Sequence, residues 1–354
     1  MEKLVLIDGH AILHRAFHAY PPLTNSKGEL TGAVYGFTSI LLAILKKLRP
    51  EYAVVAFDKK APTFRHKKFK NYKIHRKPMD DDLIKQILPV HKVVEDLNIP
   101  IFEVDGYEAD DVIGTLARQA VQKTRNTQRI RKSENLKIRK SDLSDNLKIR
   151  HTELSEFSES LEVIIVTGDQ DAMQLVGDNV KVFMPARGKQ AEKIYDEKAV
   201  LEKYRLKPLQ IVDFKALAGD SSDDIPGVSG IGPKTATNLL NKYNTFEKIY
   251  ASLDELPVKI AEKLKRDEKQ ALLSQELARI DTESPVKLDL RACRLTDYDR
   301  GKVIKLFEEL EFKSLIEKLP GDNWMESAEE ILGGKEKKVK PKKNKDREKQ
   351  MGLF

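Results

Sequence analysis

The chain has 354 residues, which is enough for about two domains and a large buried core. No apolar run is long enough for a membrane-spanning helix, and the single cysteine, Cys293, excludes an internal disulfide and a cysteine-based zinc cluster. The net charge is +7, but residues 335–349 carry nine Lys/Arg against three Asp/Glu, so the rest of the chain is close to neutral. We therefore expect a cytoplasmic protein with no membrane association.

Short apolar runs rich in Val and Ile alternate with segments of helical periodicity over the first 220 residues or so. The runs lie at 3–7, 53–57, 101–104 and 163–167. Such alternation is typical of an α/β domain with a mostly parallel sheet. From about residue 208 the strand signal gives way to helices and Gly-Pro turns. We predict a core at 1–207, a helical domain at 208–320 and a disordered basic tail at 321–354.

Nine carboxylates fall in five clusters, four of which closely follow an apolar run. They are Asp8, Asp58, Glu108, Asp110, Asp111, Asp169, Asp171, Asp220 and Asp223. Because the carboxyl ends of parallel strands share one rim, most of these side chains should meet there. Two carboxylates about 5 Å apart repel by roughly 3 kcal/mol at an effective dielectric near 20. Separate helix caps are the alternative for each cluster, but together the clusters predict bound cations.

Oxygen-only ligands favour Mg²⁺ or Mn²⁺ over Zn²⁺. Two such ions about 4 Å apart can bind a phosphodiester, lower the pKa of a water and stabilise the leaving oxygen. His10, His14 and His18 recur every four residues, and we expect them to pack or lie near phosphate rather than bind zinc.

Residues 59–77 carry nine Lys/Arg and no acid, close to the acidic clusters in sequence. A basic segment beside an acidic site indicates an enzyme that acts on a phosphate polymer. If this segment is helical, Lys73 and Arg76 share one face and could hold phosphates, with Arg65 nearby, while Tyr72 could stack on an unpaired base. A solvated charged helix is the alternative.

A polar insertion at about 122–160 interrupts the α/β pattern and contains an 11-residue tandem repeat. Residues 133–139 return, almost unchanged, as residues 144–150. We expect a surface loop on the side away from the metal rim, without a catalytic role. An amphipathic helix that binds a partner is the alternative.

A glycine-rich turn at 227–236 is flanked by helical segments. Its residues with backbone or phosphate roles are Gly227, Gly230, Gly232, Lys234 and Thr235. Such a turn directs backbone N–H groups outward, and the following helix N-terminus can hold a phosphate. It reads no bases, so we predict a helix-hairpin-helix that binds duplex without sequence preference.

Six motifs together resemble the 5′-nuclease of bacterial DNA polymerase I, a member of the flap endonuclease superfamily. They lie at 8–9, 63–65, 72–76, 106–111, 167–171 and 219–228, and the resemblance covers residues 1 to about 320. It implies a PIN-like α/β core with a mostly parallel twisted sheet and flanking helices. A helical arch built from about 60–90 and a C-terminal all-α helix-three-turn-helix domain are also implied.

The resemblance also implies roles for individual residues. Asp8, Asp58, Asp110 and Asp169 would hold the first metal, and Asp171, Asp220 and Asp223 the second, with Glu108 and Asp111 partly in the outer shell. Lys73 and Arg76 would steer the scissile phosphate as catalytic residues. The family pattern further implies a potassium ion on the carbonyls of 227–232.

The chain departs from the family pattern in three places. Asp224 stands where such proteins often carry Asn, which adds a charge beside Asp223. The insertion at about 122–160 has no reliable counterpart. Only 34 residues follow Pro320, too few for a polymerase domain, and with Met1 in place we expect a free-standing nuclease rather than a fragment.

The last five residues are Gln-Met-Gly-Leu-Phe and resemble the short peptide by which bacterial replication enzymes dock on the sliding clamp. Leu353 and Phe354 would be the apolar anchors and Gln350 the polar contact. A basic tether carrying such a peptide would raise the local concentration of the protein at DNA.

These observations predict a monomeric, nucleoid-associated, structure-specific 5′-3′ exonuclease and 5′-flap endonuclease. It would remove RNA primers and repair flaps by a two-metal mechanism. Two alternatives remain at this point: a catalytically inactive, clamp-tethered DNA-binding protein, and a PIN-type ribonuclease.

Overall fold

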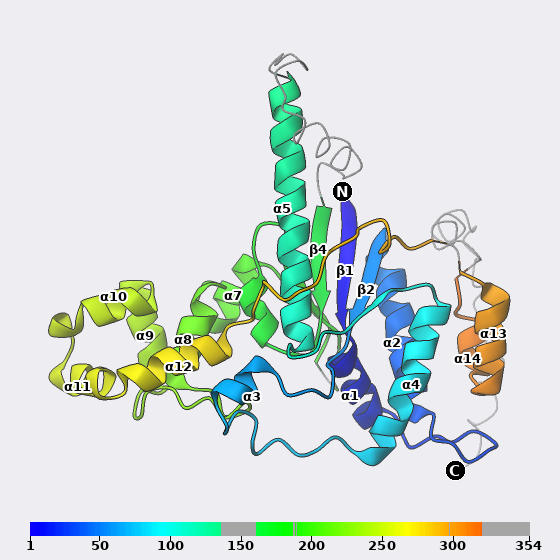
Figure 1. Ribbon diagram of the computed structural model, residues 1–354, viewed down its shortest axis with the longest axis horizontal. Helices are drawn as coiled ribbons and strands as arrows, with labels where there is room; N and C mark the ends of the chain where they lie inside the picture. The colour runs from blue at the N-terminus through cyan, green and yellow to red at the C-terminus, as the bar shows by residue number, and fades with distance from the viewer. Residues whose placement is uncertain (136–160, 187, 189, 297, 321–354) are drawn as a thin grey trace, which may run out of the picture.

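The computed structural model describes residues 1–135, 161–186, 188, 190–296 and 298–320. An α/β sheet domain carries a lobe of helices on one side (Figure 1). In the part of the chain that is described, no helix is both long and apolar enough to cross a membrane.

Six strands form one sheet. They are β1 Glu2–Asp8, β2 Tyr52–Ala56, β3 Ile101–Phe102, β4 Leu161–Val166, β5 Val180–Met184 and β6 Lys193–Tyr195. The order is β3-β2-β1-β4-β5-β6, and every pairing is parallel except that of β5 with β6. The mostly parallel α/β sheet expected from the alternating pattern is confirmed. Because the chain proceeds outward in opposite directions from β1, the rim at the carboxyl ends of β1 and β4 is a topological switch point.

Both faces of the sheet are buried, which explains why its strands read as continuous apolar runs. Leu4 and Leu6 pack with α5 Ala109–Asn135, and Val5 and Ile7 pack with the helices on the opposite face. Those helices are α1 Gly9–Ala19, α2 Gly32–Leu48 and α4 Asp81–Asp96.

The helical lobe follows β6 and extends away from the sheet (Figure 1). Its helices are α7 Glu197–Tyr204, α8 Gln210–Ala218, α9 Pro233–Tyr243, α10 Phe246–Ala251, α11 Val258–Arg266 and α12 Glu268–Ala278. Short 3₁₀ segments, η2 Asp171–Leu175 and η3 Leu253–Glu255, lie before and within it. α8 packs on both α9 and α12, so the glycine-rich turn is held between packed helices.

We predicted one helical domain at 208–320. The chain after α12 instead returns to the sheet domain. Lys123 of α5 donates to the Leu288 carbonyl (2.7 Å), and Ala53 of β2 donates to the Cys293 carbonyl (2.9 Å). The last helices, α13 Arg300–Glu309 and α14 Lys313–Ile316, bury Phe307 among the side chains that cover the α1–α2–α4 face. The predicted 208–320 unit therefore combines a helical lobe with a strap that packs on the core.

The basic segment at 59–77 does not form one continuous helix, so Lys73 and Arg76 do not share a helix face. After α3 Phe64–Lys68 it runs through turns until α4 begins at Asp81. Lys73 has a φ of 54°, in the left-handed region that no α-helix contains.

Helix α5 runs into the predicted insertion, which begins at about residue 122, and continues to Asn135. Its far end projects beyond the amino ends of β1 and β4, away from the carboxyl rim, as predicted for the insertion (Figure 1). Most of the tandem repeat lies outside the described residues.

Candidate metal centre and nucleic-acid interface

The ends of β1 and β4 are joined by side chains at the switch point. Asp8 is the last residue of β1 and caps α1 by accepting from the Ala11 amide (2.9 Å). Its other oxygen accepts from the Thr167 hydroxyl (2.8 Å), which in turn accepts from the Asp169 amide (3.0 Å). The strand order thus brings Asp8 and Asp169 to one place.

The end of β2 is tied to the start of α5. Asp58 accepts from the Ala109 amide (2.7 Å) at the first residue of α5, where an anion is favoured by the helix dipole. The Asp58 amide donates to His10 Nδ1 (2.9 Å). His10 is therefore a hydrogen-bonded neighbour of the site, and Asp110 follows one residue after Ala109.

Burial and mutual repulsion make the carboxyls of this centre hard to ionise together. Burial, with Asp58 and Asp169 nearby, raises the pKa of Asp8 to about 7. Burial, with Asp8, Asp169 and Asp171 nearby, raises the pKa of Asp110 well above its ordinary value. A divalent cation would restore the charged forms, so these oxygen donors fit Mg²⁺ or Mn²⁺.

A second cluster lies beside the first. Asp171, Asp220 and Asp223 each offer an oxygen, and these oxygens lie within 4.8 Å of one another. Among the described residues this is the one group of three such ligands at that spacing. Burial raises the pKa of Asp171 to about 6, although Lys215 opposes the shift. The trio fits a second divalent cation.

Lys215 is a site residue that the sequence reasoning missed. Its ammonium lies against both Asp171 and Asp220, in the position where a cation would relieve their repulsion. In the sequence, Lys215 could have been noticed only as a single cation within the apolar run of α8, five residues before Asp220. Only the packing of α8 against η2 shows that it faces the carboxylates.

Lys73 joins the basic segment to this second cluster. Its ammonium is 2.9 Å from Glu108 Oε2 and 3.8 Å from Asp223 Oδ2. Burial alone would raise the pKa of Glu108, but Lys73 and then Arg65 outweigh it and lower that pKa. The Arg76 amide donates to the Lys73 carbonyl (3.1 Å), and the Arg76 side chain is exposed.

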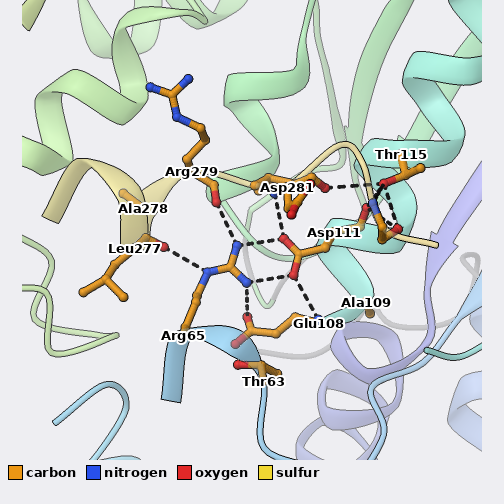
Figure 2. A network of polar contacts seen from close by, with 12 residues as sticks. Thr63, Arg65, Glu108, Ala109, Asp111, Thr115, Leu277, Ala278, Arg279 and Asp281 are labelled. Carbon is orange, nitrogen blue, oxygen red and sulfur yellow. Dashed lines mark hydrogen bonds and ion pairs between the residues drawn. The ribbon is translucent and has the colours of Figure 1, made fainter. Parts of the chain in front are cut away.

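The predicted DNA contact of Arg65 is wrong, and Asp111 is not a direct metal ligand, because the two side chains satisfy each other (Figure 2). Arg65 is 3% exposed and also donates to the carbonyls of Leu277 and Arg279, so it has no surface for DNA. Asp111 is fully buried and both its oxygens are engaged, so it is not a metal ligand here. In the motif at 106–111, Asp110 is the carboxylate that lies near Asp8 and Asp169.

Tyr72 was predicted to stack on a base, and this is also wrong. It is 3% exposed, and its hydroxyl is 3.4 Å from both Glu108 and Asp223. Burial and these two carboxylates raise its pKa. Tyr72 is a buried support beneath the carboxylates rather than a stacking surface.

The glycine-rich turn connects α8 to α9. The Asp220 and Ile225 backbones pair with each other at its base (2.8 Å in both directions). Gly227 has a φ of 64°, and a Cβ built there would lie 2.2 Å from the Gly219 amide nitrogen. Gly232 caps α9, and it and Lys234 are exposed. The turn therefore presents the N-terminus of α9 to solvent.

Gly230 closes the turn on its far side, where its carbonyl accepts from Lys263 Nζ (2.9 Å). Thr235 is half-buried in the first turn of α9. Gln350, Leu353 and Phe354, predicted to bind a clamp, lie outside the described residues.

Comparison with known proteins gives relatives across most of the chain. It is 39% identical over 319 residues to DNA polymerase I of Caldicellulosiruptor bescii, which covers 90% of this chain and 33% of the relative. It is 37% identical over 323 residues to DNA polymerase I of Bacillus subtilis, covering 91% and 33%. The chain thus spans about a third of the length of the curated relatives it matches.

Among solved structures, T5 5′-exonuclease with divalent metal ions (zinc) bound has a TM-score of 0.57 at 20% identity, covering 88% of this chain and 99% of that one. The catalytic core of Rad2 in complex with a DNA substrate has a TM-score of 0.51 at 13% identity, covering 90% and 93%. These likenesses support the fold.

Two family models match in chain order. The 5′-3′ exonuclease N-terminal resolvase-like domain matches residues 3–131, which contain three of the strands and the first carboxylates. The 5′-3′ exonuclease C-terminal SAM fold matches residues 206–301, which contain Lys215, Asp220 and the glycine-rich turn. The strands that carry Asp8 and Asp58 to the rim and the part of the lobe that carries Asp220 and Asp223 are thus both matched, and the chain belongs to the 5′-3′ exonuclease family.

Proposed function

We propose that the chain is a structure-specific 5′-nuclease that hydrolyses one phosphodiester near the junction of single- and double-stranded DNA. The observation that carries this is the placement of Lys73. Its ammonium reaches both Glu108 and Asp223, so the basic segment meets the second carboxylate cluster. In the cell, such a nuclease would remove RNA primers and repair flaps.

Two Mg²⁺ ions, or Mn²⁺ in their place, are the proposed cofactors. Asp8, Asp58, Asp110 and Asp169 would hold one ion. Asp171, Asp220 and Asp223 would hold the other, with Lys215 displaced from it. When bound, such ions supply Lewis acidity and neutralise charge on a scissile phosphate. The T5 5′-exonuclease, which shares the fold, has been solved with divalent metal ions.

The chain's own residues would bind and orient the substrate. Lys73 is held by Glu108, and Arg76 is exposed beside it, so both can attract a phosphate to the rim. The exposed N-terminus of α9 would hold a phosphate of the adjoining duplex. A potassium ion on the carbonyls of 227–232 would add positive charge there.

We also propose that the chain works as a monomer at the nucleoid and docks on a sliding clamp through Gln350, Leu353 and Phe354. The tether would raise its concentration at DNA without a further contact. Deletion of 350–354 should abolish clamp binding in a pull-down with purified clamp, while unchanged clamp affinity contradicts this part.

The decisive experiment measures cleavage of a 5′-flap substrate with Mg²⁺, with Mn²⁺ and with a chelator. The wild type should cleave near the junction only with a divalent ion, and Asp110→Asn should bind the flap without cleaving it. Asp178→Asn is the matched control, because Asp178 is an exposed carboxylate before the amino end of β5 and should leave cleavage unchanged.

The rival functions give different results in the same assay. Tight flap binding by the wild type without any cleavage favours an inactive DNA-binding protein. Cleavage of single-stranded RNA with no preference for a junction favours a PIN-type ribonuclease.

A further inference from the structure

Two turns that are far apart in sequence face each other beside the second carboxylate cluster. The turn at 71–76 carries Lys73 with a φ of 54°, and the turn at 223–224 carries Asp224 with a φ of 56°. Left-handed backbone is disfavoured for residues other than glycine, and it persists where the surroundings over-determine it. Asn and Asp tolerate it best, but Lys has no such advantage. Contacts between the two turns must therefore hold Lys73 in this conformation.

Three hydrogen bonds connect the turns. The Lys73 amide donates to the Asp223 carbonyl (3.1 Å). The His75 amide donates to Asp224 Oδ2 (3.1 Å), and His75 Nδ1 lies 2.7 Å from Asp224 Oδ1. One carboxylate thus holds the backbone and the ring of the same residue. An amide side chain at position 224 has a single acceptor oxygen and no charge, so it would hold the amide and the ring less well than a carboxylate with two oxygens.

The connected turn also carries the cations of the site. Lys73 reaches Glu108 and Asp223, and Arg76 is bonded through its backbone to Lys73. The His75 side chain itself is 85% exposed, so its pairing with Asp224 is not imposed by burial of the ring. Its pairing with Asp224 and the bond from the Lys73 amide to the Asp223 carbonyl fix the backbone on the two sides of the exposed Ile74.

We propose that Asp224 and His75 form a latch that fixes the 71–76 turn against the 223–224 turn. The latch sets the positions of Lys73 and Arg76 relative to Asp223, so both latch residues are positioning residues. The role of the positioned cations rests on the proposed function, but the latch itself does not. In this latch the carboxylate of Asp224 has His75 as its partner within the chain.

Limited trypsin digestion of the full chain, without DNA or metal, tests the latch directly. Lys73 and Arg76 offer trypsin sites within the latched turn, whereas Pro78 blocks cleavage after Lys77. Asp224→Ala removes both contacts and should speed cleavage at these sites the most. His75→Ala keeps the backbone bond and Asp224→Asn keeps one acceptor, so each should be intermediate.

Lys302→Ala is the control, because it removes an exposed cation paired with Asp96 at α13, away from the latch. It should leave cleavage at these sites as in the wild type. If both Asp224→Ala and His75→Ala keep the wild-type cleavage rate at these sites, the latch does not exist. His75→Ala is included because His75 is exposed, so this variant tests the latch even if Asp224→Ala disturbs folding.

A double-mutant cycle tests whether the latch acts through the cations. Asp224→Ala should lower kcat/KM on a flap substrate by about tenfold, the effect of losing one or two hydrogen bonds to a charged group. In an Arg76→Ala background the same change should cost less, because the positioned group is already gone. Equal factors in both backgrounds overturn the positioning role. If the wild type cleaves no substrate, the proposed function fails, and the trypsin result still decides the latch.

Discussion

Arg65 and Asp111 form a two-pronged ion pair, with both N–O distances at 2.7 Å, in a place that solvent does not reach. Asp111 also accepts from the amides of Glu108 and Asp281 (Figure 2). Arg65 also donates to the Leu277 carbonyl at the end of α12. The pair therefore joins the basic segment, the start of α5 and the end of the helical lobe. It also supports Glu108, which holds Lys73.

Arg65→Ala should destabilise the protein by about 3–5 kcal/mol, because it leaves the Asp111 charge buried without a partner. Urea unfolding followed by circular dichroism measures this. Arg65→Met combined with Asp111→Leu should be less destabilising than Arg65→Ala alone, since no buried charge remains. A loss no larger than that of Lys85→Ala, which breaks an exposed pair with Asp82, would contradict the prediction.

The strand ends could be predicted from sequence because their signal is local. Each apolar run is short, and parallel pairing then places Asp8 and Asp169 on one rim. Which carboxylate of a motif turns inward is not local. Asp110 and Asp111 are adjacent, yet Asp111 is buried against Arg65 because residues 277–281 cover it, some 170 positions further along the chain.

The same reason explains the error at Tyr72 and the missed Lys215. An aromatic residue in a basic segment suits stacking until a neighbouring loop buries it, and the loop that does so contains Asp223. Lys215 belongs to an apolar helix whose orientation only tertiary packing sets. The return of residues 280–320 to the sheet was likewise invisible, since its segments lack a strand or long helix that would reveal their partner.

Lys215→Met should make the protein more dependent on divalent metal. Without its ammonium, Asp171 and Asp220 repel each other in the absence of a cation, so the melting temperature of the metal-free protein should fall. Mg²⁺ should restore most of the loss, and the Mg²⁺-induced rise should exceed that of the wild type. Thermal melts with Mg²⁺ and with a chelator measure both. An equal rise in the two proteins would contradict the stand-in role of Lys215.

Gly227→Ala should disrupt the glycine-rich turn. The new Cβ would need a positive φ and would meet the Gly219 backbone, which cannot rotate away as a side chain could. We expect a loss of at least about 2 kcal/mol in unfolding free energy and weaker binding to duplex DNA. Gly232→Ala is the matched control for folding, because nothing lies within 4 Å of a Cβ there. Equal stability of the two variants would show that the turn adapts.

Metal binding and pH should be linked through Asp8. Its pKa in the folded protein is raised to about 7 by burial and by Asp58 and Asp169, whereas an unfolded Asp titrates near about 4. A raised pKa means that the folded state binds the proton more tightly. The contribution of Asp8 to stability is therefore fully present below about pH 4 and is lost as the pH rises through about 7.

The carboxyls of Asp110 and Asp171 act in the same direction, because their pKa values are also raised. A divalent cation competes with these protons, so it binds more tightly as the pH rises. The increase in melting temperature caused by Mg²⁺ should grow between about pH 5.5 and about pH 8. Asp8→Asn, which can neither titrate nor offer a charged ligand, should show a smaller increase that depends less on pH, while Asp178→Asn should behave as the wild type. A Mg²⁺ effect of the same size at both pH values would mean that these buried carboxyls do not hold the metal.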